Sequence, residues 1–301
     1  MKNTKKMTDA QRKAWQDEVK NERAEMLTKA VEKFGNSESF KEYLRFMNTF
    51  HQYSACNSLL IWFQGGTLVA GFNAWKEKGR SVKKGEKAIK IYAPMMGKGW
   101  FTVLDENGIP KKDEDGKEIK VLKQYVKGFR RVSVFDVSQT EGKELPELAN
   151  PKMLTGDMTE EEYNGLFEMI SKATTAKVEM EEITNGSNGY FAPQENRIAV
   201  NKGMSKEQSI KTLIHEVTHS LLHNEEEMKK NPKSREHKEV EAESVAYLVC
   251  SYLGIDSAEY SFEYVSAWAL GDVKLITKSM DTIKKTADKI IEVLENEEKA
   301  A

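Results

Sequence analysis

The stretch Ser205–His223, with the sequence SKEQSIKTLIHEVTHSLLH, decides the fold of the second half of this chain. Ser205 can cap the first turn of a helix, and Gln208 stands at the third helical position, as in a capping box. The apolar residues then recur at helical spacing and form one stripe, which comprises Ile210, Leu213, Ile214, Val217 and Leu221. We therefore predict an amphipathic helix over about residues 205–223.

Two histidines on this helix have the spacing of metal ligands. His215 and His219 are four residues apart, so their side chains lie one turn apart on one face. Two imidazoles placed in this way can hold one zinc ion at about 2.0–2.1 Å each. Glu216 can reach a water on such an ion as general base. The string predicts a site with one Zn2+ per chain that activates water for hydrolysis. The alternative is a charged helix surface with two solvated histidines.

A catalytic zinc ion needs a third protein ligand. The candidates downstream are His223, His237, Glu239, Glu241 and Glu243. His223 lies one further turn along the same helix, too far along its axis to share the ion, and we interpret it as structural. In the helical segment that follows, Glu239 and Glu243 share a face, whereas Glu241 points elsewhere. We predict Glu239 as the third ligand and Glu243 as the acceptor that orients a ligating imidazole. Glu241 as the ligand, and a helix surface merely covered by glutamates, stay open.

The rest of the chain divides at a stretch rich in turn-forming residues, 138–157. Before it we expect helices at about 8–35, 37–47 and 53–63, and then four short strand-like runs at 88–93, 99–104, 118–124 and 131–136. After it we expect a helix near 159–173, strands near 177–182, 190–192 and 198–201, and helices at about 205–223, 236–253, 258–269 and 273–297. This pattern predicts an α+β protein. Its first domain, residues 1–140, has N-terminal helices and a small antiparallel sheet; residues 141–157 are a linker, and residues 158–301 form a second α+β domain.

Charge is distributed unevenly between the two halves. Residues 1–150 contain 28 lysines and arginines against 20 acidic residues, whereas the rest contains 18 against 28. A polyanion such as nucleic acid is attracted to the first half. Single strands are held by cations that follow the phosphates and by rings that stack on the bases. We predict such a surface, with little sequence specificity, at Trp75, Arg80, Lys83, Lys84 and Lys87. The alternative for Trp75 is a core position.

The composition favours a cytoplasmic protein that does not enter a membrane. The sequence has no apolar run of about 18 residues, and its first residues are polar and charged, unlike a secretory signal. Cys56 and Cys250 lie far apart in apolar contexts, which indicates buried free thiols in a reducing compartment.

Longer motifs resemble a known family. The strings YSACNSLLIWFQ (53–64), VAGFNAWKEKGRSVKKGEKAIKIYAP (69–94) and VSVFDVSQTEG (132–142) resemble the N-terminal domain of the ArdC antirestriction family. The strings LIHEVTHSLLH (213–223) and KEVEAESVAYLVC (238–250) resemble the zincin-like metallopeptidase domain of that family, which is similar to the ImmA/IrrE peptidases. The resemblance covers about residues 10–270. It implies a single-stranded-DNA-binding protein of a conjugative plasmid, transposon or phage. By position it carries the metal motif onto His215, Glu216, His219 and Glu239, although the charged segment 224–237 differs in length among relatives.

Two hypotheses of function follow. In the first, the chain is an antirestriction-type protein that coats incoming single-stranded DNA and carries a zinc metallopeptidase-like domain. In the alternative, it is an active zinc metalloprotease that cleaves a repressor or a DNA-bound protein, and DNA binding only targets it. A peptide substrate could pair with Arg197–Asn201, which we interpret as an edge strand. Tyr190 or Tyr264 could stabilise the oxyanion.

Overall fold

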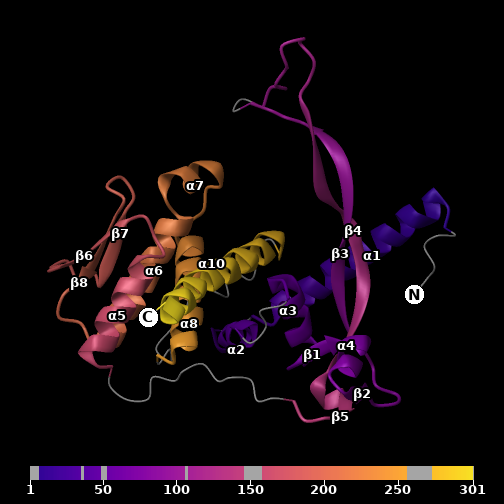
Figure 1. Cartoon of the computed structure of the whole chain (residues 1–301), viewed down its shortest axis with the longest axis horizontal. Helices are drawn as coiled ribbons and strands as arrows, with labels where there is room; N and C mark the ends of the chain where they lie inside the picture. Colours follow the sequence, from indigo (N-terminus) through magenta and orange to yellow (C-terminus); the bar gives the residue numbers. More distant parts are fainter. Residues whose placement is uncertain are drawn as a thin grey trace. The chain divides into compact units, whose positions relative to one another are not determined.

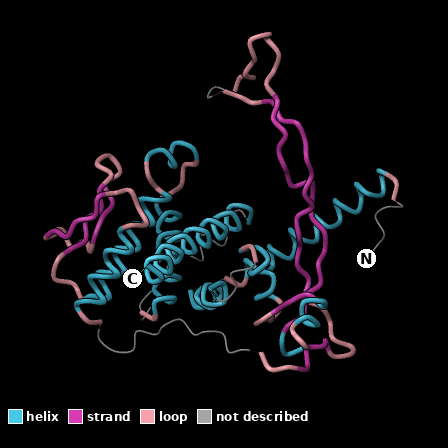
Figure 2. The backbone as a smooth tube through the Cα atoms, in the orientation of Figure 1, coloured by secondary structure: helices cyan, strands magenta, loops and turns pink. Residues whose placement is uncertain are grey.

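The computed structural model describes residues 7–34, 37–48, 53–105, 108–145, 158–255 and 273–300 (Figures 1 and 2). The chain divides into two units, of which unit 1 comprises residues 1–27 and 64–143 and unit 2 comprises residues 28–63 and 144–301. Helices and small sheets alternate along the chain, and this confirms the α+β class. None of the described helices is both long and apolar enough to span a bilayer. Most of the predicted linker and the helix expected at 258–269 lie outside the described residues.

Unit 1 is built around a long two-stranded ribbon. Strands β3 (Ile89–Thr102) and β4 (Lys120–Asp136) pair antiparallel along their whole length, and β1 (Val69–Gly71) pairs with the other edge of β4 (Figure 1). Four short strands were predicted here, but the structure joins them into these two long ones. The register shifts between Met95 and Met96, where β4 has an extra residue, Lys127, as in a bulge. The base of the ribbon is completed by α4 (Phe72–Glu77), β2 (Arg80–Val82) and β5 (Thr140–Gly142).

Helix α1 (Asp9–Glu32) packs its unit 1 residues against the base of this ribbon. Arg131 of β4 donates hydrogen bonds to Glu18 and Glu22 of α1. The guanidinium of Arg23 lies 4.4 Å from the centroid of the Phe129 ring. Glu18 and Glu22 thereby neutralise Arg131, whose side chain is half-buried.

Asp136, at the end of β4, holds the base together. Its carboxylate accepts hydrogen bonds from the backbone N–H groups of Thr67, Leu68 and Ser138. It thereby joins the residues before β1 to the short 3-10 helix η2 (Val137–Gln139), which it also caps. Burial raises the pKa of Asp136, but the hydrogen bonds from Thr67, Ser138 and Leu68 outweigh burial and hold the pKa below its ordinary value.

Two of the N-terminal helices belong to unit 2. Helices α2 (Ser37–Asn48) and α3 (Ala55–Phe63) pack on α8 (Arg235–Leu253) and α10 (Val273–Ala300). The hydroxyl of Tyr43 donates to the Ala55 carbonyl, and the Ala55 N–H donates to Asp281 of α10. Residues 28–63 had been expected in the first domain. They pack in the second unit because their large apolar side chains are fully buried there, among them Phe34, Phe40, Leu59 and Leu60.

The sheet of unit 2 has the order β6-β8-β7, with β6 (Lys177–Glu181) parallel and β7 (Gly189–Ala192) antiparallel to β8 (Arg197–Asn201). The expectation that Arg197–Asn201 is an edge strand was therefore wrong. Its three middle residues, Ile198, Ala199 and Val200, are fully buried, as in a strand paired on both sides. Helix α6 (Lys206–Leu222) contacts both β7 and β8, and α5 (Glu160–Ser171) packs against α6.

The short helix α7 (Glu225–Lys230) follows α6, within the charged segment 224–237 in which no helix was predicted. Asn224 caps it by accepting a hydrogen bond from the Glu227 N–H. Three glutamates occupy its first turn and two lysines its last, an arrangement that favours a helix through its dipole.

The Asp136 network gives a first prediction. Asp136→Asn should lower the free energy of unfolding at pH 7 by about 2–4 kcal/mol, because hydrogen bonds to a charged group contribute about 1.5–3 kcal/mol each. A carboxyl whose pKa is lowered in the folded state stabilises the fold above its unfolded pKa, near 3.9, and loses this contribution as the pH falls through the folded pKa. The difference between wild type and variant, measured by urea denaturation, should therefore shrink below about pH 4.

Asp113→Asn is the matched control. Asp113 also accepts backbone hydrogen bonds, from Asp115 and Lys117, but it does so in an exposed turn. Its replacement should change the unfolding free energy by less than about 0.5 kcal/mol. Equal stabilities of Asp136→Asn and wild type at pH 7 would contradict the role assigned to this carboxylate.

Candidate metal centre

Helix α6 carries the central residues of the site, and its start is fixed by Ser205. The Ser205 hydroxyl accepts the N–H of Gln208 as predicted, whereas the Gln208 side chain donates to Thr212 instead of returning to the cap. The predicted apolar face of α6 is fully buried at Ile210, Leu213, Ile214 and Val217. Packing of this face fixes the rotation of the helix, so that the histidine side chains face a cavity.

Three ligand atoms converge between α6 and α8. Nε2 of His215 lies 3.0 Å from Nε2 of His219 and 3.5 Å from Oε2 of Glu239, and the third distance, from His219 to Glu239, is 3.9 Å. A tetrahedral ion bound at about 2.0–2.1 Å separates its ligand atoms by about 3.3 Å. The three distances lie around this value, so two imidazoles and one carboxylate fit a single divalent ion. Within the described residues this is the cluster with the geometry of a metal site.

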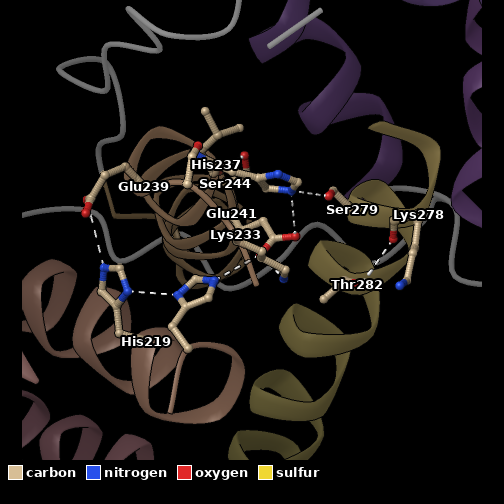
Figure 3. A network of polar contacts seen from close by, with 12 residues as sticks. His219, Lys233, His237, Glu239, Glu241, Ser244, Lys278, Ser279 and Thr282 are labelled. Carbon is tan, nitrogen blue, oxygen red and sulfur yellow. Dashed lines mark hydrogen bonds and ion pairs between the residues drawn. The ribbon is translucent and has the colours of Figure 1, made fainter. Parts of the chain in front are cut away.

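Each imidazole has a partner on its other nitrogen. Nδ1 of His215 lies 3.5 Å from Glu243, the residue predicted to orient a ligating imidazole. Nδ1 of His219 lies 2.8 Å from Nδ1 of His223, whose Nε2 lies 2.9 Å from Oε2 of Glu241 (Figure 3). If Nε2 of His219 is a ligand, its Nδ1 carries the proton and donates to His223. His223 then donates from Nε2 to the carboxylate, so this chain selects the tautomer of His219.

The carboxylate at the end of this chain is anchored in the protein interior. Glu241 and His223 are almost fully buried, and Lys233 lies 2.5 Å from the same Oε2 atom. Nε2 of His237 lies 3.3 Å from Oε1 of Glu241 and also contacts Ser279 of α10 (Figure 3). Burial raises the pKa of Glu241, but the hydrogen bonds from His223, His237 and Lys233 hold the pKa well below its ordinary value.

The contact between His223 and Glu241 was not predicted from the sequence. His223 was interpreted as the structural end of a helix, and Glu241 as pointing away from the metal. Both descriptions hold, yet the two side chains meet each other behind His219. The available signal was the second four-residue step, from His219 to His223, which continues the histidine face of α6.

Glu216 lines the same cavity and is held by the backbone of β7. It is 8% exposed, and the Phe191 N–H donates a hydrogen bond to its carboxylate. Burial raises the pKa of Glu216 to about 7, although the neighbouring His215 opposes the shift. For His219, burial and the neighbouring His215 and His223 lower the pKa, so this imidazole is neutral at pH 7, as a metal ligand must be.

The cavity is about 520 Å³ and is lined by α6, β7 and α8. Gly189 lets β7 approach α6 closely, because a Cβ there would lie 2.6 Å from Thr212 and 3.3 Å from the Glu216 side chain. Tyr190 also borders the cavity, but its hydroxyl is engaged by Glu181 and Arg197. Tyr264, the other candidate for the oxyanion, lies outside the described residues.

The residues predicted to bind DNA do not form one exposed surface. Trp75 is 1% exposed and its indole N–H donates to the Phe135 carbonyl, so its ring has no face free for a base. The guanidinium of Arg80 donates hydrogen bonds to Thr140 and to the Lys143 carbonyl, and these bonds fix β5. The remaining three residues, Lys83, Lys84 and Lys87, are exposed around a turn, and Lys83 bonds the Ser138 carbonyl.

Comparison with known proteins gives one family match in each half of the sequence. Residues 8–135 match the family model described as the N-terminal domain of anti-restriction factor ArdC. Residues 177–255, which include the donor cluster, match the IrrE N-terminal-like domain of the M78 peptidases. One chain thus matches both family models. This confirms the resemblance read from the sequence motifs.

Individual relatives are distant. An uncharacterized protein of Bacillus anthracis, pXO2-81, is 26% identical over 97% of this chain, and the chain spans 54% of the length of that relative. The metal-free crystal structure of the antirestriction protein ArdC from plasmid R388 matches with a TM-score of 0.51 and 21% identity, covering 81% of this chain and 86% of that one. Its Mn(II)-bound structure matches with a TM-score of 0.49 and 21% identity, covering 82% and 86%. The match to the metal-free structure shows the fold alone.

The donor geometry predicts how two glutamates differ. Glu239→Gln should abolish stoichiometric zinc, because it removes an anionic ligand. Glu243→Gln, the matched control on the same face of α8, should retain one zinc per chain with affinity lowered about 10- to 100-fold, as for partners that only orient a ligand. Zinc content after dialysis and competition with a chelating dye measure both. Full zinc retention in Glu239→Gln, with loss in Glu241→Gln, would contradict the assignment.

The chain behind His219 gives a separate prediction. His223→Ala removes no ligand but leaves Nδ1 of His219 without its acceptor, so zinc affinity should fall about 10- to 100-fold while the stoichiometry stays at one. Thermal unfolding of the zinc-free variant shows whether the helix remains folded. An unchanged zinc affinity in a folded variant would mean that His223 does not act on the site.

Proposed function

We propose that this chain is a single-stranded-DNA-binding, antirestriction-type protein of a mobile genetic element, whose second unit carries one zinc ion in a metallopeptidase-like site. The observation that carries the proposal is the combination of an ArdC N-terminal domain with the IrrE-like domain in one chain. A DNA partner follows from the first domain, and the excess of basic residues in the first half of the sequence supports it. In this function the chain coats entering single-stranded DNA in the cytoplasm and shields it from nucleases.

In the second unit, Glu216 lines the same cavity as three groups that can bind a divalent ion. A divalent ion on His215, His219 and Glu239 would supply Lewis-acid polarisation of a carbonyl and of an attacking water. Glu216 can accept a proton from that water as its oxygen bonds to the carbonyl carbon, and can return the proton to the amine as the C–N bond breaks. The hydrogen bond from Phe191 holds its carboxylate at the cavity.

One observation favours the alternative function, an active protease that DNA binding merely brings to a repressor or a DNA-bound protein. Strand β7 is an edge strand, since the order of the sheet is β6-β8-β7, and it borders the cavity. An extended peptide can add to such an edge through backbone hydrogen bonds. It would then lie along Gly189–Ala192, next to Glu216, rather than on Arg197–Asn201 as the sequence suggested.

Glu216→Gln separates the two functions. The change is isosteric and removes the proton acceptor but no proposed ligand, so zinc content and unfolding should match wild type. Any cleavage of an unfolded test substrate such as β-casein should fall about 10²- to 10⁴-fold. Binding of a single-stranded oligonucleotide, and its protection from a nuclease, should be unchanged. Loss of protection together with loss of cleavage would instead favour the protease, and an affinity for oligonucleotide that does not depend on salt would contradict DNA binding.

A further inference from the structure

The outer part of the ribbon in unit 1 exposes an unusual number of apolar side chains. We define the outer ribbon as residues 96–102 of β3 and 120–127 of β4. Among the residues that the structure describes, ten large hydrophobic side chains are exposed; six of them lie on the outer ribbon and three more on the loop that joins its strands. Trp100 alone is 69% exposed. A cluster of exposed apolar side chains of this kind indicates a binding surface.

The strand register sorts these side chains onto two faces. Directly paired residues of antiparallel strands share a face. Trp100 pairs with Leu122 and Met96 with Val126, so one face carries these four apolar groups. The opposite face carries Tyr125 and Phe101, whose rings form an edge-to-face pair with centroids 5.7 Å apart.

Two glycines fix the ring of Tyr125. A Cβ at Gly97 would lie 3.1 Å from Cζ of Tyr125, and a Cβ at Gly99 would lie 3.2 Å from its Cε1 atom. The ring therefore lies flat over backbone that has no side chains of its own, an arrangement that supports glycine within a ribbon. Its other side faces solvent, since the residue is 41% exposed.

The charge of the outer ribbon is entirely positive. Its four charged residues are the exposed lysines Lys98, Lys120, Lys123 and Lys127. At the base, by contrast, Lys90 and Arg131 are paired with glutamates of α1. The loop beyond the outer ribbon, residues 103–119, is predominantly acidic. A polyanion is therefore attracted to the strands and not to the loop.

The combination of rings and cations determines the occupant. A second copy packed on the Trp100 face would cover the apolar groups but would place Lys98 and Lys120, which share that face, against the same lysines of the other copy. Single-stranded DNA offers planar bases for the rings and phosphates for the ammonium groups at the same time. We propose that the outer ribbon is the single-stranded-DNA-binding site of this chain, with Trp100, Phe101 and Tyr125 as stacking platforms. This assignment rests on the proposed function and replaces Trp75 as the source of stacking.

The test uses the full-length chain and a fluorescein-labelled oligo(dT), with binding measured by fluorescence anisotropy at several salt concentrations. Trp100→Leu keeps an apolar side chain but removes the ring, and should weaken binding about 5- to 150-fold, as should Tyr125→Leu. Trp100→Phe should retain most of the affinity. Ile109→Ala, at an exposed apolar residue of the loop, is the matched control and should bind as wild type does.

Replacing all four lysines by glutamine should reduce the slope of log K against log[salt] by about 3, since each phosphate contact contributes about 0.7 for single strands. If wild type binds the oligonucleotide and the ring variants bind equally well, the ribbon assignment is wrong although the proposed function stands. Loss of binding in Lys83→Gln/Lys84→Gln/Lys87→Gln alone would place the site at that turn. Failure of wild type to bind would overturn both. A dimer in sedimentation that Trp100→Leu dissociates, with DNA binding unchanged, would assign the ribbon to a second copy.

Discussion

The packing of α6 against α8 is the interaction on which the second unit depends. It sets the carboxylate of Glu239 beside two imidazoles that one helical turn has already paired. The same contact brings Glu241 to His223 inside the core. The helix α7 separates α6 from α8 in the sequence. The ligands on the two helices are therefore held together only by the packing of α6 against α8.

This dependence explains how far the site could be predicted. His215, Glu216 and His219 follow from a four-residue period that any helix imposes. Glu239 and Glu243 could be selected because they share a face of a second helix. The role of Glu241 could not, because its partner His223 lies on a different helix and nothing in either local pattern shows that the two meet. The oxyanion donor could not be predicted either. The hydroxyl of Tyr190, one of the two candidates, donates to Glu181 within its own sheet, which only the tertiary structure shows.

In unit 1 the local sequence pattern predicts the strands better than it predicts which side chains are exposed. The positions of the strand-like runs could be predicted, whereas Trp75 takes the core position that was expected as the alternative, with its indole buried and bonded to β4. Trp100 and Phe101 lie in the strand-like run expected at 99–104, but the sequence does not show that their rings remain exposed. The ring of Tyr125 lies flat over Gly97 and Gly99. A composition window detects charge, but only the register shows which rings remain in water.

The central claim is that two imidazoles from one helix and a carboxylate from another bind one divalent ion. Anomalous diffraction at the zinc edge, from crystals of the zinc-loaded chain, tests it most directly. The account predicts one peak per chain, about 2.0–2.1 Å from Nε2 of His215, from Nε2 of His219 and from the Glu239 carboxylate. The absence of a peak there, or a peak coordinated by Glu241 in place of Glu239, would contradict it.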